Sequence, residues 1–215
     1  MFALENVRYR DILSIPRLEI PSGEVTCIVG RSGSGKTTLL RLLNRMISPD
    51  EGSIRYKGDP ITAIDPVQLR RQVVMLPQTP VMFDGTVRDN LLIGLEFSER
   101  EPAGDDVLRR VLEVMDLPKG LDDDAATLSG GEKQRVALGR VLVMRPAAAL
   151  LDEPSSALDE GTERAVIGRL ADAARERGVT LVVVTHSRPL ANAIADTLIE
   201  IEAGQIVGVR DGSRA

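Results

Sequence analysis

The stretch that organises this sequence is Gly30-Arg31-Ser32-Gly33-Ser34-Gly35-Lys36-Thr37. It matches the pattern G-x-x-x-x-G-K-[ST], whose glycines let successive backbone N–H groups point into one concavity. The apolar run at residues 24–29 predicts a strand before it. Apolar residues recurring at three- and four-residue spacing from 39 to 47 predict an amphipathic helix after it. A strand, a glycine-rich loop and a helix N-terminus in this order predict a phosphate-binding loop.

Three side chains at the end of this loop have predicted roles toward a bound nucleoside triphosphate. We expect Lys36 to reach the β- and γ-phosphates and the Thr37 hydroxyl to ligate Mg²⁺. Thr38 adds a contact on the α-phosphate side.

The rest of the chain alternates strand-like and helix-like segments, which predicts one α/β domain with a largely parallel sheet. Strands are expected at residues 1–7, 17–20, 24–29, 53–56, 73–76, 147–151, 179–184, 197–202 and 205–209. The first of these predict an antiparallel β subdomain near the N-terminus. Residues 86–126 have helical periodicity without a convincing strand, and helices are expected at 132–144 and 160–177. We therefore expect a single domain over 1–215, with a helical subdomain at approximately 86–145 inserted in its core.

Composition limits the partners and chemistry of this chain. Its 215 residues carry a net charge of −5, with a pI near 5.1. That balance argues against broad binding to nucleic acid or to an anionic lipid surface. Cys27 is the single cysteine, so an internal disulfide and a Cys-rich zinc site are excluded. Its apolar neighbours predict a small buried residue, and a reducing, cytoplasmic setting fits.

Two adjacent carboxylates follow a predicted buried strand, at Asp152 and Glu153. Carboxylates in such a place are costly unless a cation accompanies them, and Mg²⁺ would supply it. Asp152 is expected to hold the ion, directly or through water. Glu153 points differently and is a candidate base for the attacking water. A strand that ends in solvated acids is the alternative, and the phosphate-binding loop in the same chain argues against it.

A second candidate phosphate site lies at Leu128-Ser129-Gly130-Gly131-Glu132-Lys133-Gln134-Arg135. A hydroxyl and two glycines here begin a helix, which again favours an anion. One nucleoside triphosphate has one γ-phosphate, so two such devices in one chain require an explanation.

At this stretch the sequence resembles the ABC ATPase family, whose signature reads LSGGQ or LSGGE. The order of motifs also agrees: the phosphate-binding loop, Gln78, the signature, the acidic pair, Ser156-Ala157-Leu158-Asp159 and then His186. The resemblance extends from about residue 2 to residue 209. It implies a P-loop NTPase core that binds ATP and Mg²⁺ and hydrolyses ATP to power an ABC transporter.

The resemblance also implies how the residues divide the work between two chains. Two subunits would meet head to tail, so that the loop of one and Ser129, Gly130, Gly131 and Glu132 of the other enclose each ATP. Gln78 would contact the Mg²⁺ or the attacking water and sense a membrane subunit. Asp159 would cross the dimer interface, and His186 would hold the γ-phosphate and the water.

No apolar run reaches the ~20 residues needed to cross a bilayer, and residues 1–10 do not have the pattern of a secretory leader. A separate integral membrane permease is therefore the expected partner. We expect this chain on the cytoplasmic face of the membrane, paired with an identical ATPase subunit or a paralogue. Its compact length and short helical insertion resemble small subunits of metal exporters.

Two assignments stay open at this stage. Tyr9 is the candidate aromatic residue for stacking on adenine, but an ordinary strand position accounts for it equally well. Met82 and Phe83 are either contacts for the membrane subunit or part of the core.

A non-transport ABC ATPase that acts on DNA or ribosomes is the competing function. The absence of cysteines for zinc, of long coiled coils and of a second ATPase domain argues against that function, as does the negative charge.

Overall fold

The computed structural model describes residues 1–212 and contains two sheets. The first is antiparallel and has the order β2 (Leu13–Ile20), β1 (Phe2–Tyr9), β4 (Glu51–Tyr56), β5 (Asp59–Pro60). The second has the order β10 (Gln205–Asp211), β9 (Thr197–Glu202), β3 (Val25–Val29), β8 (Thr180–Thr185), β7 (Ala148–Asp152), β6 (Val73–Leu76). Its neighbours are parallel except for the β9–β10 hairpin. The predicted fold class is confirmed.

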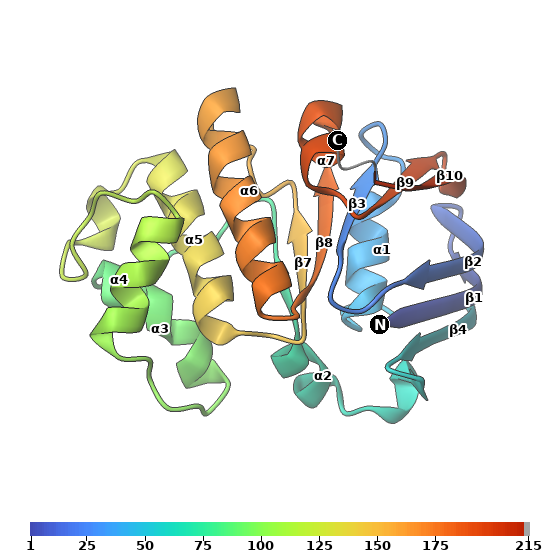
Figure 1. Cartoon of the computed structure of the whole chain (residues 1–215). Coiled ribbons are helices and arrows are strands. Elements are labelled where there is room, and N and C mark those ends of the chain that lie inside the picture. Colours follow the sequence, from blue (N-terminus) through green and yellow to red (C-terminus); the bar gives the residue numbers. More distant parts are fainter. Residues whose placement is uncertain (213–215) are drawn as a thin grey trace.

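The helices cover both faces of the parallel sheet. Helix α1 (Lys36–Leu43) buries its leucines between the antiparallel sheet and one face of the parallel sheet. The opposite face is covered by α5 (Gly130–Met144), α6 (Glu160–Glu176) and α7 (Arg188–Ile194). Figure 1 shows the antiparallel sheet at one end and α3 (Val87–Phe97) with α4 (Asp105–Val114) at the other. Short elements complete the described chain: α2 (Pro66–Gln72) and 3₁₀ turns at Ile61–Ala63 and Ala125–Thr127.

The predicted strand at 17–20 was too short, because β2 begins at Leu13 and passes through Pro16. Proline cannot donate a backbone hydrogen bond, so it argues against a central strand. Here β2 is the edge of its sheet, where only β1 pairs with it, with Ile15 opposite Val7. An edge strand tolerates the missing N–H.

The predicted helix after the phosphate-binding loop was too long. Helix α1 ends at Leu43, and Arg45 turns the chain with a φ of 55°. Met46 is therefore exposed rather than part of the buried face. Helices α2 and α7 were not predicted, because each is short and carries only a small apolar face: Leu69 in α2, and Leu190, Ala191 and Ile194 in α7.

Helices α3 and α4 approach α5 closely at Gly139. A Cβ placed on Gly139 would lie 2.9 Å from Leu91 Cδ2 and 2.9 Å from Val111 Cγ1. Leu91 and Val111 belong to the same buried apolar cluster. The glycine therefore sets how near these helices lie to the rest of the core, although the division into subdomains stays a prediction.

We expect Gly139→Ala to lower the free energy of unfolding by about 1–3 kcal/mol, because the added methyl group overpacks this contact. Gly168→Ala in α6 is the matched control, since its Cβ would meet nothing within 4 Å. Alanine at that open helical position should stabilise the protein by up to about 1 kcal/mol. Urea unfolding of both variants measures the difference, and equal effects would contradict the close approach.

Candidate nucleotide-binding site

The phosphate-binding loop joins β3 to α1 and is closed by Lys36. Its ammonium group donates to the carbonyl oxygens of Gly30 and Arg31, both at 2.9 Å, and its side chain is buried. Gly30 must lack a side chain, because a Cβ there would lie 2.1 Å from the Ile201 carbonyl oxygen. Gly35, at a φ of 100°, begins α1. The loop is therefore a closed concavity held together by the Lys36 ammonium group.

Ser34 supplies a test of whether this concavity fits a polar ligand. Its side chain is buried, and its Oγ has no hydrogen-bond partner among residues 1–212. A buried hydroxyl without a partner is costly. The loop thus combines a buried lysine, an unsatisfied hydroxyl and a helix N-terminus, which fits a phosphate group.

The loop and the acidic pair meet at Thr37 and Asp152. The Thr37 hydroxyl lies 3.0 and 2.8 Å from the two carboxylate oxygens of Asp152, which is itself buried. Hydroxyl and carboxylate oxygens are the donors that Mg²⁺ prefers, together with phosphate oxygens and water. The residues present therefore fit a magnesium ion at this point.

Glu153 has an uncommon backbone conformation next to the buried Asp152. Its φ is 46°, in the left-handed region, and its N–H donates to the Val184 carbonyl at 2.9 Å. Its carboxylate accepts from the backbone N–H of His186 at 3.3 Å and lies 2.8 Å from His186 Nδ1. Strain of this kind costs about 1–3 kcal/mol and often marks functional positions. Here it turns the Glu153 carboxylate toward His186.

These groups line one cavity of about 330 Å³ at the carboxyl ends of the parallel strands. The cavity brings together most of the predicted cis residues: Ser32, Gly33, Gly35, Lys36, Thr37, Thr38, Gln78, Glu153 and His186, joined by Val184. Asp152 lies directly behind Thr37, and Arg31 contributes its carbonyl oxygen to Lys36.

Ser129, Gly130, Gly131 and Glu132 do not line this cavity. They form the N-terminus of α5, where Ser129 and Glu132 make a reciprocal capping box. Hydrogen bonds from Ser129, its backbone N–H first, lower the pKa of the Glu132 carboxyl. Ser129 and Gly130 are exposed. The segment predicted to be a second phosphate site thus forms a capped helix N-terminus that lies apart from the cavity.

Asp159 is also outside the cavity. It is the N-cap of α6, where its carboxylate accepts from the N–H groups of Gly161 at 3.1 Å and Thr162 at 3.0 Å. Hydrogen bonds from Thr162, side chain first, lower its pKa. Within one chain Asp159 is a capping residue on the surface, and its part in a dimer interface stays a prediction.

Tyr9 does not line the cavity. It ends β1, packs against the core and lies under the Arg10 guanidinium, whose carbon is 5.2 Å from the ring centroid. The turn that follows comes closer to the phosphate-binding loop. A Cβ on Gly35 would lie 2.8 Å from Leu13 Cδ1 and 3.2 Å from the Ile12 carbonyl. The Leu13 side chain and the Ile12 backbone therefore lie beside the loop, and the Ile12 side chain is exposed.

The family model described as "ABC transporter" matches residues 13–156. This chain belongs to the ABC transporter family. It is 39% identical to ABC transporter I family member 17 of Arabidopsis thaliana over 92% of this chain and 75% of that protein. It is 40% identical to the methionine import ATP-binding protein MetN of Mesorhizobium japonicum over 88% of this chain and 53% of that one. It therefore spans only about half the length of the bacterial relative.

The fold of this ABC chain agrees with a solved ATP-binding cassette, in a dimeric post-hydrolysis state with ADP and Pi bound. The TM-score is 0.86 at 26% identity, and the match covers 100% of both chains. The present chain is thus an ATPase of the ABC transporter type by family and by fold. The likeness to metal-exporter subunits stays a prediction.

One residue of the site was missed from the sequence. Gln134, in α5, is buried and donates to the Pro154 carbonyl at 2.7 Å, directly after Glu153. It ties the helix that begins at Ser129 to the loop that carries Glu153. Its place in the signature stretch was visible, but the contact joins positions twenty residues apart and gives no local signal.

We expect Lys36→Met to weaken ATP binding at least about tenfold, because a charge-assisted hydrogen bond contributes about 1.5–3 kcal/mol. The substitution also removes both contacts that close the loop. Lys57→Met, at an exposed turn beside β4, is the matched control and should bind normally. Titration with a fluorescent ATP analogue measures both, and equal affinities would show that this loop is not the nucleotide site.

Proposed function

We propose that this chain binds and hydrolyses ATP as one half of a head-to-tail dimer and so drives a separate membrane permease. The observation that carries the proposal is the separation of the two phosphate-binding devices. The cavity holds the loop, Gln78, Glu153 and His186, but Ser129–Glu132 lie outside it. A second copy, turned by a two-fold axis, would supply the missing segment to each site.

Within one subunit, the loop amides and Lys36 hold the β- and γ-phosphates. Thr37 and Asp152 would hold Mg²⁺, with Gln78 at the cavity wall beside them. A magnesium ion held there would supply positive charge to the phosphate oxygens.

Glu153 accepts a proton from a water molecule as that oxygen forms a bond to the γ-phosphorus. The bond from that phosphorus to the β–γ bridging oxygen breaks, and its electrons leave with ADP. His186 orients the Glu153 carboxylate, which lies 2.8 Å from Nδ1. The side chain of His186 is 76% exposed in the single chain, so a second subunit has room to cover it.

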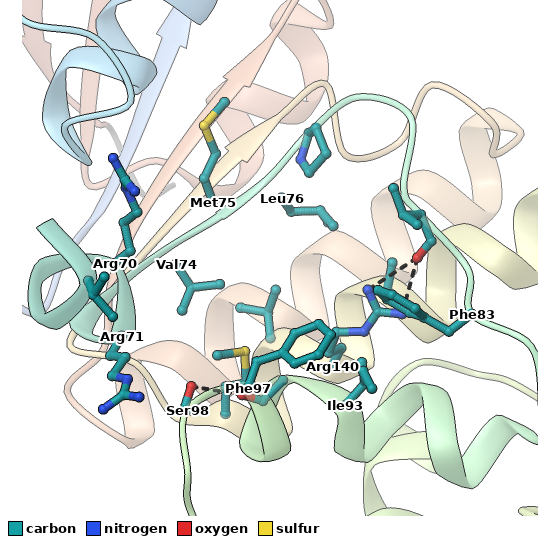
Figure 2. A pocket seen from close by; sticks show the side chains of 17 residues that line it. Arg70, Arg71, Val74, Met75, Leu76, Phe83, Ile93, Phe97, Ser98 and Arg140 are labelled. Carbon is teal, nitrogen blue, oxygen red and sulfur yellow. Dashed lines mark hydrogen bonds between the residues drawn. The ribbon is translucent and has the colours of Figure 1, made fainter.

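A groove next to the ATP cavity supports the proposal that the chain binds a membrane permease. It has a volume of about 360 Å³ and is lined by residues of β6, α2, α3 and α5. Figure 2 shows the side chains that line it. The exposed Phe97, Val81 and Val67 give it an apolar wall, and Arg70, Arg71 and Arg140 lie along it. Phe97 is 64% exposed and continues this apolar surface, and a contiguous exposed apolar patch is typical of an interaction site.

Phe83 and Met82, whose roles the sequence left open, have different surroundings in the structure. Phe83 lines the groove, with its ring edge-on to Phe97 at 5.7 Å and under the Arg140 guanidinium at 5.4 Å. Met82 packs against the buried core cluster instead. We therefore assign Phe83, and not Met82, to the surface that a permease helix would contact.

The groove and the ATP cavity share one short segment. Met75, Leu76 and Pro77 line the groove, and the next residue, Gln78, lines the cavity. A movement of Gln78 on loss of the γ-phosphate would therefore pass directly to Pro77 and so to the groove. Among residues 1–212 no helix is long and apolar enough to cross a membrane. As the resemblance to ABC ATPases implies, we also propose that the chain lies on the cytoplasmic face of the membrane, bound to its permease through this groove and paired with an identical or paralogous ATPase.

We expect Glu153→Gln to lower turnover by at least about a hundredfold while leaving ATP binding intact, because the base is lost but the phosphate contacts remain. With ATP and Mg²⁺ this variant should elute as a dimer in size-exclusion chromatography, and with ADP as a monomer. Glu160→Gln, at an exposed position of α6, is the control for turnover. Normal turnover of Glu153→Gln would overturn the assignment of the base.

Adding Ser129→Arg to Glu153→Gln tests the head-to-tail arrangement. The double variant should still bind ATP as a monomer, since Ser129 is outside the cavity, but should not dimerise. Ser53→Arg, exposed on β4, is the matched control and should dimerise normally. If the Ser129 variant dimerises, the interface does not use this segment.

We expect Phe97→Glu to reduce capture of a multi-span membrane protein by at least about tenfold, because an anchor of an apolar interface would be lost. Tagged Glu153→Gln protein with ATP and Mg²⁺ would be the bait, in detergent-solubilised membranes of its source. Val207→Glu, on the exposed side of β10, is the control. ATP hydrolysis by the isolated subunit should not change with Phe97→Glu. Recovery of only DNA, ribosomes or soluble proteins would overturn the transport role.

A further inference from the structure

Lys119 connects the loop after α4 to the N-terminus of α5. Its ammonium group lies 3.2 Å from Oε1 of Glu132. Both side chains are largely shielded from water, with 28% of Lys119 and 17% of Glu132 exposed. The pair is therefore screened less than an ordinary surface ion pair.

The other oxygen of the same carboxylate holds Ser129. Oε2 of Glu132 accepts from the Ser129 N–H at 2.8 Å, and the Glu132 N–H donates to the Ser129 Oγ at 3.3 Å. These two bonds fix the Ser129 backbone and leave its hydroxyl proton free to donate elsewhere. Glu132 thus occupies one oxygen with Ser129 and the other with Lys119.

A carboxylate at this position conflicts with the proposed function. The helix N-terminus attracts anions through its partial positive charge, and Glu132 already satisfies part of it. In the proposed dimer the partner's ATP brings its γ-phosphate to the same helix end. An unpaired carboxylate there would repel that phosphate, whereas a glutamine could cap Ser129 without a charge.

We propose that Lys119 is a positioning residue for the ATP held by the partner subunit. It neutralises Glu132, so that the capping box holds Ser129 in place without repelling the γ-phosphate. This inference rests on the proposed head-to-tail dimer. Lys119 touches neither the cavity of its own subunit nor, in this scheme, the nucleotide itself.

Two arginines of α5 and α6 contact Asp116 and not Glu132. Arg135 donates to the Asp116 carbonyl at 2.7 Å, and Arg169 lies 3.5 Å from the Asp116 carboxylate. Among the ion pairs of residues 1–212, Lys119 is the cation that Glu132 has.

The test is a charge cycle on steady-state ATP hydrolysis. We expect Lys119→Met to raise the KM for ATP about three- to tenfold, the size of one partly screened charge, with kcat changed less than about twofold. Lys119→Arg should recover most of that affinity. In a Glu132→Gln background, Lys119→Met should add less than about a twofold change, because no carboxylate charge remains to be neutralised.

Two further readouts separate this role from a structural one. Raising the salt concentration should reduce the difference in KM for ATP between Lys119→Met and wild type, since the defect is electrostatic. ATP binding by the monomer should not change. If Lys119→Met raises the KM equally in the wild-type and Glu132→Gln backgrounds, Lys119 only holds its loop in place. An unchanged KM in Lys119→Met would also overturn the proposal. If Ser129→Arg hydrolyses ATP normally, the dimer itself is wrong and the inference falls with it.

Discussion

The parallel pairing of β8 with both β3 and β7 is the constraint on which the site depends. In that register Val29 lies opposite Thr185, and Asp152 lies opposite Val184. The loop after β3, the acidic pair at the end of β7 and His186 after β8 therefore lie at one edge of the sheet. Strand β6 pairs with β7 and brings Gln78 to the same edge. Segments far apart in the chain meet there because parallel strands end together.

That edge concentrates polar groups whose burial costs free energy without a partner. Lys36 and Asp152 are buried, Ser34 has an unsatisfied hydroxyl, and Glu153 has a left-handed backbone. The apolar clusters on both faces of the sheet offset this cost, since most residues of β3, β7 and β8 contribute to one cluster or the other. The strands beneath the site are mainly apolar, and their burial stabilises the fold that holds these polar groups.

A chain of direct contacts links this edge to two surfaces. One runs through Gln78 and Pro77 to the groove that Phe97 lines. The other runs from Pro154 through Gln134 to the helix that begins at Ser129. The groove and the N-terminus of α5 are both exposed in the single chain, and both are built on helices that pack against the core. This arrangement suits a subunit whose cycle depends on making and breaking contacts with other chains.

The sequence by itself determined the elements that depend on local order: the loop before α1, the acids after β7, the cap at Ser129, the buried β8 and the fold class. Glycine spacing, apolar periodicity and capping residues are read within a few positions, so they carry this information. The tertiary structure alone decided that Pro16 lies within an edge strand and that Ile12 and Leu13, just after Tyr9, lie against Gly35 of the loop. It also decided that Phe83 faces the groove and that Lys119 pairs with Glu132. These outcomes depend on which distant segment lies across from each residue, and a chain does not encode that in its local pattern.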